Sequence, residues 1–281
     1  MRTIVIYPGR FHPFHRGHRA SYDYLIKRFG ANNVYVATSD KQAPVTSPFS
    51  YSDKVEMMTK LGIPAGKIVQ VVNPYQAEEI LKDIPDPENT QVVFAVSEKD
   101  MAAKSPENPD GPRFRFGLKK NGEPTKMQPM PEDPKKMQSM DKHTYVMVTP
   151  TVNFRVRGAD ANSASEIRKR YIAGNDADRN QIIADLYGEV DPGLRDIFDK
   201  KLGMVERTQN MVAEARKINS KHSVRLIERV LEMERQVHAH DQEDIADDYL
   251  EEKWSQKYKR SINCARPRGF SQRAHCAGRK K

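Results

Sequence analysis

The chain has 281 residues, of which 37% are hydrophobic and 30% charged, proportions typical of a globular α/β domain with an extension. No apolar run approaches the roughly 18 residues of a membrane-spanning helix, so no membrane partner is expected, and two cysteines are too few for a disulfide framework, which favours a cytoplasmic setting. The net charge of +9 suggests a polyanion partner, but residues 253–281 hold ten cations and no acid, which leaves residues 1–252 at −1.

Short apolar runs of the strand type alternate with helical patterns through the first half of the chain. The expected strands are residues 3–7, 34–38, 67–72, 91–96 and 145–149. The expected helices between them are residues 17–29, 51–61 and 76–82. Ser50 and Asp53 form a capping-box pattern before the second helix, and Gly62 marks its end. This alternation predicts an α/β fold, a Rossmann-like parallel sheet of about five strands flanked by helices, with ligands bound at the carboxyl ends of the strands.

Residues 97–143 interrupt the alternation, because they are rich in Pro, Lys, Met and Gly and carry only one apolar pattern, Phe114-Arg115-Phe116. A loop of that length is uncommon inside a compact domain. Two interpretations stay open, a lid over the site and a disordered insertion, and the lid is favoured.

Three further helices are expected at residues 163–172, 179–187 and 192–202, the last ending at Gly203. Helical spacing then continues to about residue 237 through an apolar stripe of Met211, Ala215, Ile218, Val224, Ile227 and Leu231. The stripe predicts packing against the body or against a second copy of the chain, which makes this segment the candidate for a homo-oligomer contact. The expected domains are residues 1–203 with the 97–143 insertion, a helical extension at 204–252 and a basic tail at 253–281.

The first expected strand runs into the sequence GRFHPFHRGH, residues 9–18, where the next helix begins. Backbone N–H groups and the positive end of a helix dipole favour an anion at such a junction. His15 and His18 are three residues apart, so their side chains can point to one face and add two donors. Gly9 and Gly17 allow the backbone to approach a nucleotide closely. The stretch therefore predicts a phosphate site.

Residues 9–18 resemble the first motif of the HxGH nucleotidyltransferase superfamily, whose members transfer a nucleoside monophosphate from a triphosphate to a phosphate- or carboxylate-bearing acceptor. The GRFxPFHxGH form is closest to the nicotinamide mononucleotide adenylyltransferases of archaea and of bacterial bifunctional enzymes, which usually carry Gln where this chain has His12. Residues 162–168, NSASEIR, resemble the second motif, ISSTxxR. Residues 47–50, SPFS, resemble the NPFT segment, and residues 97–100, SEKD, occupy the place of a nucleotide-contacting loop.

The resemblance implies a role for residues of both motifs. The implied catalytic residues are His15 and His18, which would hold the α- and β-phosphates, and Arg168, which would grip the β- and γ-phosphates. The implied nucleotide-binding residues are Gly9, Arg10, Phe11, Gly17, Ser163 and Ser165. Lys41 and His12 are weaker candidates for binding the acceptor, the alternatives being an exposed lysine and a solvent-facing loop histidine.

The implied reaction is attack of an acceptor phosphate on the α-phosphorus of a nucleoside triphosphate, with pyrophosphate as leaving group. Mg²⁺ is expected on the phosphate oxygens, with no protein ligand assigned to it. The implied substrates are ATP and a small phosphorylated acceptor, nicotinamide mononucleotide, which would give NAD. The alternatives are pantetheine-phosphate, flavin or cytidylyl transfer in the same superfamily and, from another class, an inactive virion or nucleic-acid-binding protein on this fold.

The basic tail follows an acidic stretch at residues 241–252. Ten cations without an acid predict a solvated segment that binds either nucleic acid or the acidic stretch of the same or another copy. Cys264, His275 and Cys276 are three potential metal ligands, but two are adjacent and a local fourth is missing, so a zinc site is not expected. The tail is similar to basic, cysteine-containing tails of tailed-bacteriophage proteins, which suggests a viral origin and a host cytoplasm.

Overall fold

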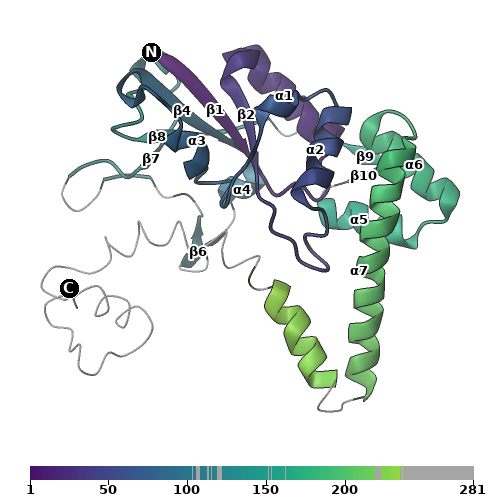
Figure 1. The fold of residues 1–281 in the computed structure, drawn as a ribbon. Coiled ribbons are helices and arrows are strands. Elements are labelled where there is room, and N and C mark those ends of the chain that lie inside the picture. The colour runs from purple at the N-terminus through teal and green to yellow at the C-terminus, as the bar shows by residue number, and fades with distance from the viewer. Residues whose placement is uncertain are drawn as a thin grey trace, which may run out of the picture.

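A computed structural model gives the fold of the chain (Figure 1). It describes residues 1–102, 104–105, 108–112, 114, 116–118, 122–150, 152, 154–161, 163–218, 223–234 and 236. The acidic stretch, the basic tail and the candidate ligands Cys264, His275 and Cys276 lie outside these residues. Within the described ranges, no helix has the length and apolar character needed to span a membrane.

Six parallel strands form the main sheet, in the order β3-β2-β1-β4-β8-β7. The strands are β1 (Arg2–Pro8), β2 (Val34–Thr38), β3 (Ile68–Gln70), β4 (Thr90–Val96), β7 (Met127–Pro129) and β8 (Thr144–Val148). The α/β fold and all five expected strands are confirmed. Every residue of β4 is buried, as in a parallel sheet covered on both faces.

The sixth strand, β7, lies inside the expected insertion at residues 97–143. It has only three residues and ends in Pro129, a combination too short and too unlike a strand to be predicted. Part of the insertion therefore extends the sheet at its edge, where a proline is tolerated. Two short strands of the same range, β5 (Lys104–Ser105) and β6 (Asn108–Pro112), pair with each other. The lid role of this range stays a prediction.

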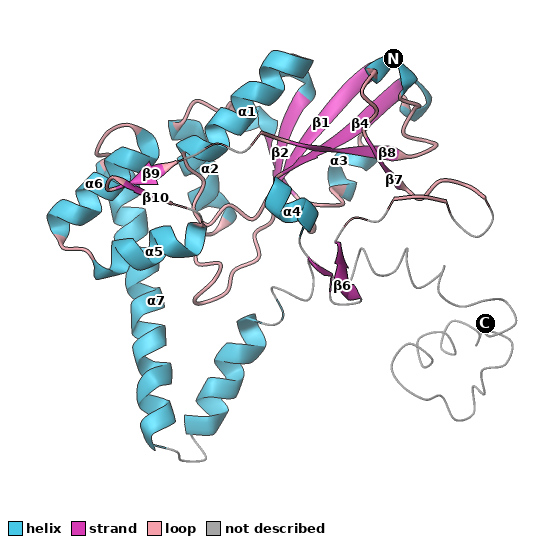
Figure 2. Cartoon of the chain, turned by 180° about the vertical axis from the view of Figure 1, so that it is seen from behind, coloured by secondary structure: helices cyan, strands magenta, loops and turns pink. Residues whose placement is uncertain are grey.

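Helices cover both faces of the sheet (Figures 1 and 2). They are α1 (Arg16–Phe29), α2 (Tyr51–Lys60), α3 (Glu78–Lys82), α4 (Glu98–Ala102), α5 (Ala164–Ala173), α6 (Asp176–Tyr187) and α7 (Pro192–Ile218). Alternation along β1 sends Val5 and Tyr7 into one hydrophobic cluster with Leu25 of α1, and Ile4 and Ile6 into another on the opposite face. The predicted capping box of Ser50 and Asp53 is present at the start of α2.

The expected helix end at Gly203 is wrong, because α7 is continuous from Pro192 to Ile218. Phe198, Leu202 and Val205 are buried at spacings of four and three residues on either side of the glycine. Their packing outweighs the cost of about 1 kcal/mol that a glycine imposes inside a helix. The domain boundary expected at this residue therefore falls within one helix.

A further helical segment, residues 223–234, follows α7. Four apolar side chains of the predicted stripe are exposed: Met211, Ile218, Val224 and Leu231. Ala215 of the same stripe is buried. A contact with a second copy through these helices stays a prediction.

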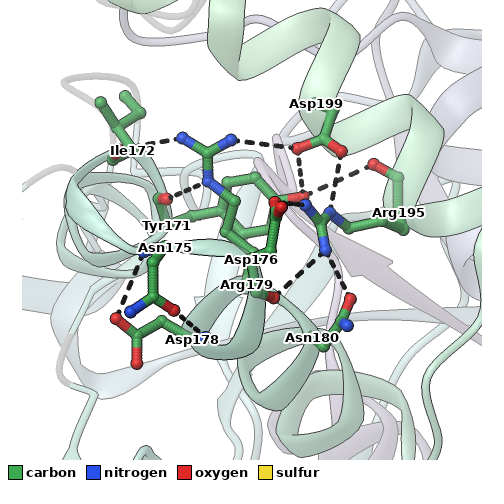
Figure 3. Close-up of polar contacts among 9 residues, drawn as sticks. All are labelled: Tyr171, Ile172, Asn175, Asp176, Asp178, Arg179, Asn180, Arg195 and Asp199. Carbon is green, nitrogen blue, oxygen red and sulfur yellow. Dashed lines mark hydrogen bonds and ion pairs between the residues drawn. The ribbon is translucent and has the colours of Figure 1, made fainter.

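A polar network joins α5, α6 and α7 (Figure 3). The Tyr171 hydroxyl of α5 donates to Asp199 of α7 at 2.9 Å, and Arg195 pairs with the same carboxylate at 2.8 Å. Arg179 of α6 donates to the carbonyl oxygen of Tyr171 at 3.1 Å. These contacts fix the position of α5, which carries Arg168 one turn before Tyr171.

Candidate active site

The loop at residues 9–15 lies at the point where the strand order of the sheet reverses. From β1 the chain builds β2 and β3 on one side and then returns to β4 on the other side. In open parallel sheets, ligands bind outside the carboxyl ends of the strands at such a reversal. The first motif and the beginning of α1 occupy this position.

His15 is the N-cap residue of α1. Its Nδ1 accepts a hydrogen bond from the backbone N–H of Gly17 at 3.1 Å. Because Nδ1 accepts, the proton of the neutral ring lies on Nε2, which is left as a donor. The ring stacks on Phe154, with centroids 4.7 Å apart and planes 8° apart. Desolvation, and then the charge of His18, hold the pKa of His15 well below its usual value, so this donor is neutral at pH 7.

His18 lies on the same face of α1, and its ring centroid is 3.9 Å from that of His15. The prediction that the two side chains share one face is therefore confirmed. The ring also contacts Phe11 and Phe14, with centroids 5.1 and 5.2 Å away. Burial lowers the pKa of His18 to about 4, although the negative charge of Asp100 acts in the opposite direction. Its Nδ1 is buried without a hydrogen-bond partner in the part of the chain that the structure describes.

Two glycines of the motif make room for side chains of the motif itself. A Cβ on Gly17 would lie 2.9 Å from ring atoms of His15, which is closer than a Cβ can come. A Cβ on Gly9 would lie 2.5 Å from the ring of Phe11, whose backbone has a left-handed φ of 49°. Phe11 is buried among Tyr7, Phe14 and His18. The expected contacts of Gly9, Gly17 and Phe11 with a nucleotide stay predictions.

Arg168 of α5 joins the second motif to the first. Its Nη1 donates to the carbonyl oxygen of His12 at 2.6 Å, and its Nη2 donates to Ser165 Oγ at 3.3 Å. Only 7% of the residue is exposed, and burial followed by the charge of Arg10 lowers the pKa of Arg168 to about 10, so it remains a cation at pH 7. Ser163 caps α5 by accepting from the N–H of Glu166 at 3.2 Å. Asn162 lies outside the described residues.

His12 is buried, so its interpretation as a solvent-facing loop residue is wrong. Its Nδ1 accepts from the backbone N–H of Phe49 at 3.3 Å, which places the proton of the neutral ring on Nε2. Among the described residues, Nε2 has no hydrogen-bond partner. Burial, then the positive charges of Lys54, Arg168 and Arg10, hold the pKa of His12 well below its usual value. Lys41 is half-buried, with its ammonium nitrogen buried, and not an exposed lysine.

Sequence reasoning missed Lys54, whose side chain is fully buried in α2. Its Nζ donates to the carbonyl oxygen of Ser39 at 2.6 Å and to Thr38 Oγ1 at 3.4 Å. A lysine is almost never fully buried unless its charge is paired or bonded. Its spacing from Met57 and Met58, three and four residues on, places it on the buried face of α2 and was the available signal. A cation therefore lies at the carboxyl end of β2.

Asp100 is a second residue that the sequence did not single out by itself. Its carboxylate accepts from the hydroxyls of Ser97 at 2.6 Å and Tyr75 at 2.9 Å. It belongs to α4, directly after β4, and its charge reaches His18. The described residues contain no group of three or more His, Cys, Asp or Glu that could hold a metal ion.

Part of the candidate site lies in a segment that matches a known protein family. Residues 6–124 match the cytidylyltransferase-like family. The match includes the loop at residues 9–15 and both histidines of α1, and it ends before α5, so the place of Arg168 rests on the structure alone.

A segment of 53 residues is 38% identical to the nicotinamide-nucleotide adenylyltransferase of Saccharolobus solfataricus, over 19% of this chain and 31% of that protein. Two structures of a bifunctional NMN adenylyltransferase/ADP ribose pyrophosphatase from Francisella tularensis, one complexed with AMP and Mn ion, are each 16% identical to this chain, with TM-scores of 0.44 and 0.42. Each match covers 78% of this chain and 56% of the solved one. The chain thus spans less than a third of the curated relative and about half of the solved structures.

Proposed function

We propose that the chain is a nucleotidyltransferase that transfers AMP from ATP to nicotinamide mononucleotide, giving NAD and pyrophosphate. The observation that carries the proposal is that Arg168 of the second motif donates to the carbonyl oxygen of His12, in the loop that leads to His15 and His18 at the start of α1. The rings of His15 and His18 are in contact with each other, and the buried cation is bonded to their loop from a residue 156 positions away. The segment similar to a nicotinamide-nucleotide adenylyltransferase supports the choice of ATP and of this acceptor.

The proposed chemistry makes one bond and breaks one. An oxygen of the acceptor phosphate attacks the α-phosphorus of ATP, and the bond from the α-phosphorus to the bridging oxygen breaks, so that the electron pair leaves with pyrophosphate. The acceptor phosphate is already ionised at pH 7, so no base has to remove a proton from it. Catalysis then rests on position and on stabilisation of the charge that builds up on the phosphate oxygens.

The protein groups suit that task. Nε2–H of His15 is a fixed donor, because Nδ1 is held by the helix start. Low pKa values keep His15 and His18 neutral, so both can donate hydrogen bonds without taking a proton from solvent. Arg168 brings a permanent positive charge to the same loop, where it would neutralise the departing pyrophosphate. Mg²⁺ enters as part of the substrate, on the phosphates of ATP, which needs few protein ligands.

Positive charge beside the histidines favours an acceptor that carries a phosphate. Lys54 lies at the carboxyl end of β2, and Arg10 and Arg168 lie close enough to His12 to lower its pKa. Nε2–H of His12 is a buried donor in this cationic surrounding. We infer that His12 and Lys41 contact the acceptor.

A substrate panel tests the proposal. ATP, CTP and GTP would each be combined with nicotinamide mononucleotide, phosphopantetheine, flavin mononucleotide and glycerol phosphate, and pyrophosphate release would be measured. We expect pyrophosphate release with ATP and nicotinamide mononucleotide. Mass spectrometry should detect NAD in that mixture alone. Activity confined to CTP would overturn adenylyl transfer in favour of cytidylyl transfer. A silent panel would favour the inactive virion or nucleic-acid-binding protein.

A further inference from the structure

The turn between β2 and α2 holds a carboxylate from a distant part of the chain. Ala43 and Ser47 close the turn through two backbone hydrogen bonds, of 3.0 and 3.3 Å. At its tip, the N–H groups of Val45 and Thr46 donate to Oε1 of Glu234 at 2.6 and 3.3 Å. The hydroxyl of Thr46 donates to Oε2 of the same side chain. One carboxylate therefore receives three donors at a turn 188 residues before it in the sequence.

This turn belongs to the candidate active site. It leads into Phe49, whose N–H donates to His12, and it follows β2 at the carboxyl edge of the sheet. Figures 1 and 2 show the unlabelled helix of residues 223–234 running back from the far end of α7 toward this connection. The charge of Glu234 also reaches Arg168, whose pKa it raises against the effect of burial.

The donor set is suited to an anion and not to glutamate in particular. Two neighbouring backbone N–H groups with a hydroxyl form a small concave site of the kind that binds phosphate oxygens. The carboxylate of Glu234 occupies it as the stand-in for such an anion. A phosphate group could accept from the same three donors only after the carboxylate had left.

The helix that carries Glu234 is held loosely. Its apolar residues Val224, Leu231 and Met233 are exposed, and Leu226, Ile227 and Val230 are only half-buried, so none of its apolar side chains is fully buried. A segment with little buried apolar surface opens at low cost in free energy. The contact of Glu234 can therefore exchange with a ligand.

We propose that the turn at residues 43–47 is an anion subsite for the phosphate of the acceptor, and that Glu234 is a built-in competitor for it. The proposal deepens the proposed function and rests on it for the identity of the acceptor. While Glu234 is bound, the acceptor phosphate lacks its donors and meets a like charge. The apparent affinity for the acceptor is then reduced by the fraction of molecules in which the turn is open.

Phosphate binding without turnover tests the subsite directly. The full chain, Glu234→Gln and Glu234→Ala would be titrated with inorganic phosphate in a calorimeter, in the absence of nucleotide. Glu228→Gln is the matched control, because Glu228 is an exposed glutamate of the same helical segment. We expect the dissociation constant for phosphate to fall about three- to tenfold in Glu234→Gln and at least as far in Glu234→Ala, since the turn is then open more often. The control should bind as the unaltered chain does.

A second substitution locates the binding. In the Glu234→Ala background, Thr46→Val should weaken phosphate binding about tenfold, because it removes a hydroxyl donor to a charged group. Across these variants, the Michaelis constant for the acceptor should change in the same direction as the dissociation constant for phosphate. The Michaelis constant for ATP should stay unchanged.

Opposite outcomes overturn the subsite. If phosphate binding is unchanged or weaker in both Glu234 variants, or if both variants fail to fold, the carboxylate is a structural clamp of the turn. If phosphate binds as tightly after Thr46→Val, the anion is bound elsewhere. The phosphate titration does not depend on nucleotidyl transfer. A chain without any transferase activity would contradict the proposed function, while the titration would still decide whether the anion subsite exists.

Discussion

The candidate catalytic side chains are oriented by contacts within their own motifs and, for Arg168, also by a contact between the motifs. His15 is held by the N–H of Gly17, two residues on, and Arg168 is held by Ser165, one turn earlier, and by the carbonyl oxygen of His12. Donors that are already oriented need little reorganisation when charge develops in a transition state. The short spacing within each motif therefore lets one residue of the motif hold the side chain of another in place.

Gly17→Ala should disturb the site without removing any functional group. The added Cβ would meet the ring of His15 at 2.9 Å, so the ring must turn away from its cap and from Phe154. We expect turnover to fall by about one to two orders of magnitude, as for a catalytic group displaced by about 1 Å.

The matched control is Gly203→Ala in the middle of α7, where a Cβ would meet nothing within 4 Å. That change should raise the free energy of unfolding by about 0.5–1 kcal/mol and leave turnover unaltered. Equal turnover in the two variants would mean that the His15 ring position is not used in catalysis.

The lowered pKa of His18 predicts how stability depends on pH. Its pKa is about 4 in the folded chain, against an ordinary value of 6.5. Between these values the unfolded chain binds a proton that the folded chain does not, so the free energy of unfolding should decrease as the pH falls from 6.5 toward 4. This contribution is fully present above pH 6.5. Urea unfolding at several pH values would measure it, with His18→Gln as the comparison. The variant should show a shallower pH dependence, and identical slopes would contradict the lowered pKa.

At the scale of elements, α5 is the part that must be positioned, because Arg168 reaches the first motif only if this helix is fixed. The network around Asp199 performs that task by linking Tyr171 of α5 to Arg195 within α7 (Figure 3). The effect of the network on chemistry is indirect, through the position of Arg168 one turn before Tyr171.

Tyr171→Phe removes the hydroxyl that donates to Asp199 at 2.9 Å. We expect the free energy of unfolding to fall by about 1–2 kcal/mol, since the acceptor is charged. Tyr24→Phe is the control, because its hydroxyl only receives a surface hydrogen bond from Arg28. Chemical denaturation would compare the two variants, and a loss of equal size in both would show that the network does not hold α5.

Prediction from sequence succeeded where the signal is local. Apolar runs located five of the six strands of the main sheet, and the pattern of Ser50 and Asp53 located the start of α2. It failed where distant packing decides the outcome. Gly203 lies inside α7 because residues around it are buried against other helices, and β7 exists only because β8 offers it an open edge.

For the candidate site too, residues with a local sequence signal were predicted and contacts between distant segments were not. The two histidines and Arg168 follow from their motifs, but the hydrogen bond from Arg168 to the carbonyl of His12 joins residues 156 positions apart and no local pattern indicates it. Lys54 has helical spacing as a faint signal, and Glu234 has none. The partners of both side chains follow from tertiary contacts.

At the scale of the whole molecule, the sheet order brings the two motifs together. The loop after β1 and the segment after β8 lie at the same carboxyl edge, with β4 between their strands. The net charge of −1 in residues 1–252 means that positive charge at the site is local, from Arg10, Lys54 and Arg168, and not a property of the body. Binding of nucleic acid or of an acidic partner by the basic tail stays a prediction.

The central claim is that His18 of the first motif and Arg168 of the second serve one reaction. The direct measurement is the rate of NAD formation from ATP and nicotinamide mononucleotide in the unaltered chain, His18→Ala, Arg168→Ala and the control Lys169→Ala, whose side chain is exposed beside Arg168. We predict NAD formation by the unaltered chain and by the control, and a loss of about 10²- to 10³-fold in each of the other two, as when one transition-state donor is removed. Unaltered rates in folded His18→Ala and Arg168→Ala would contradict the claim.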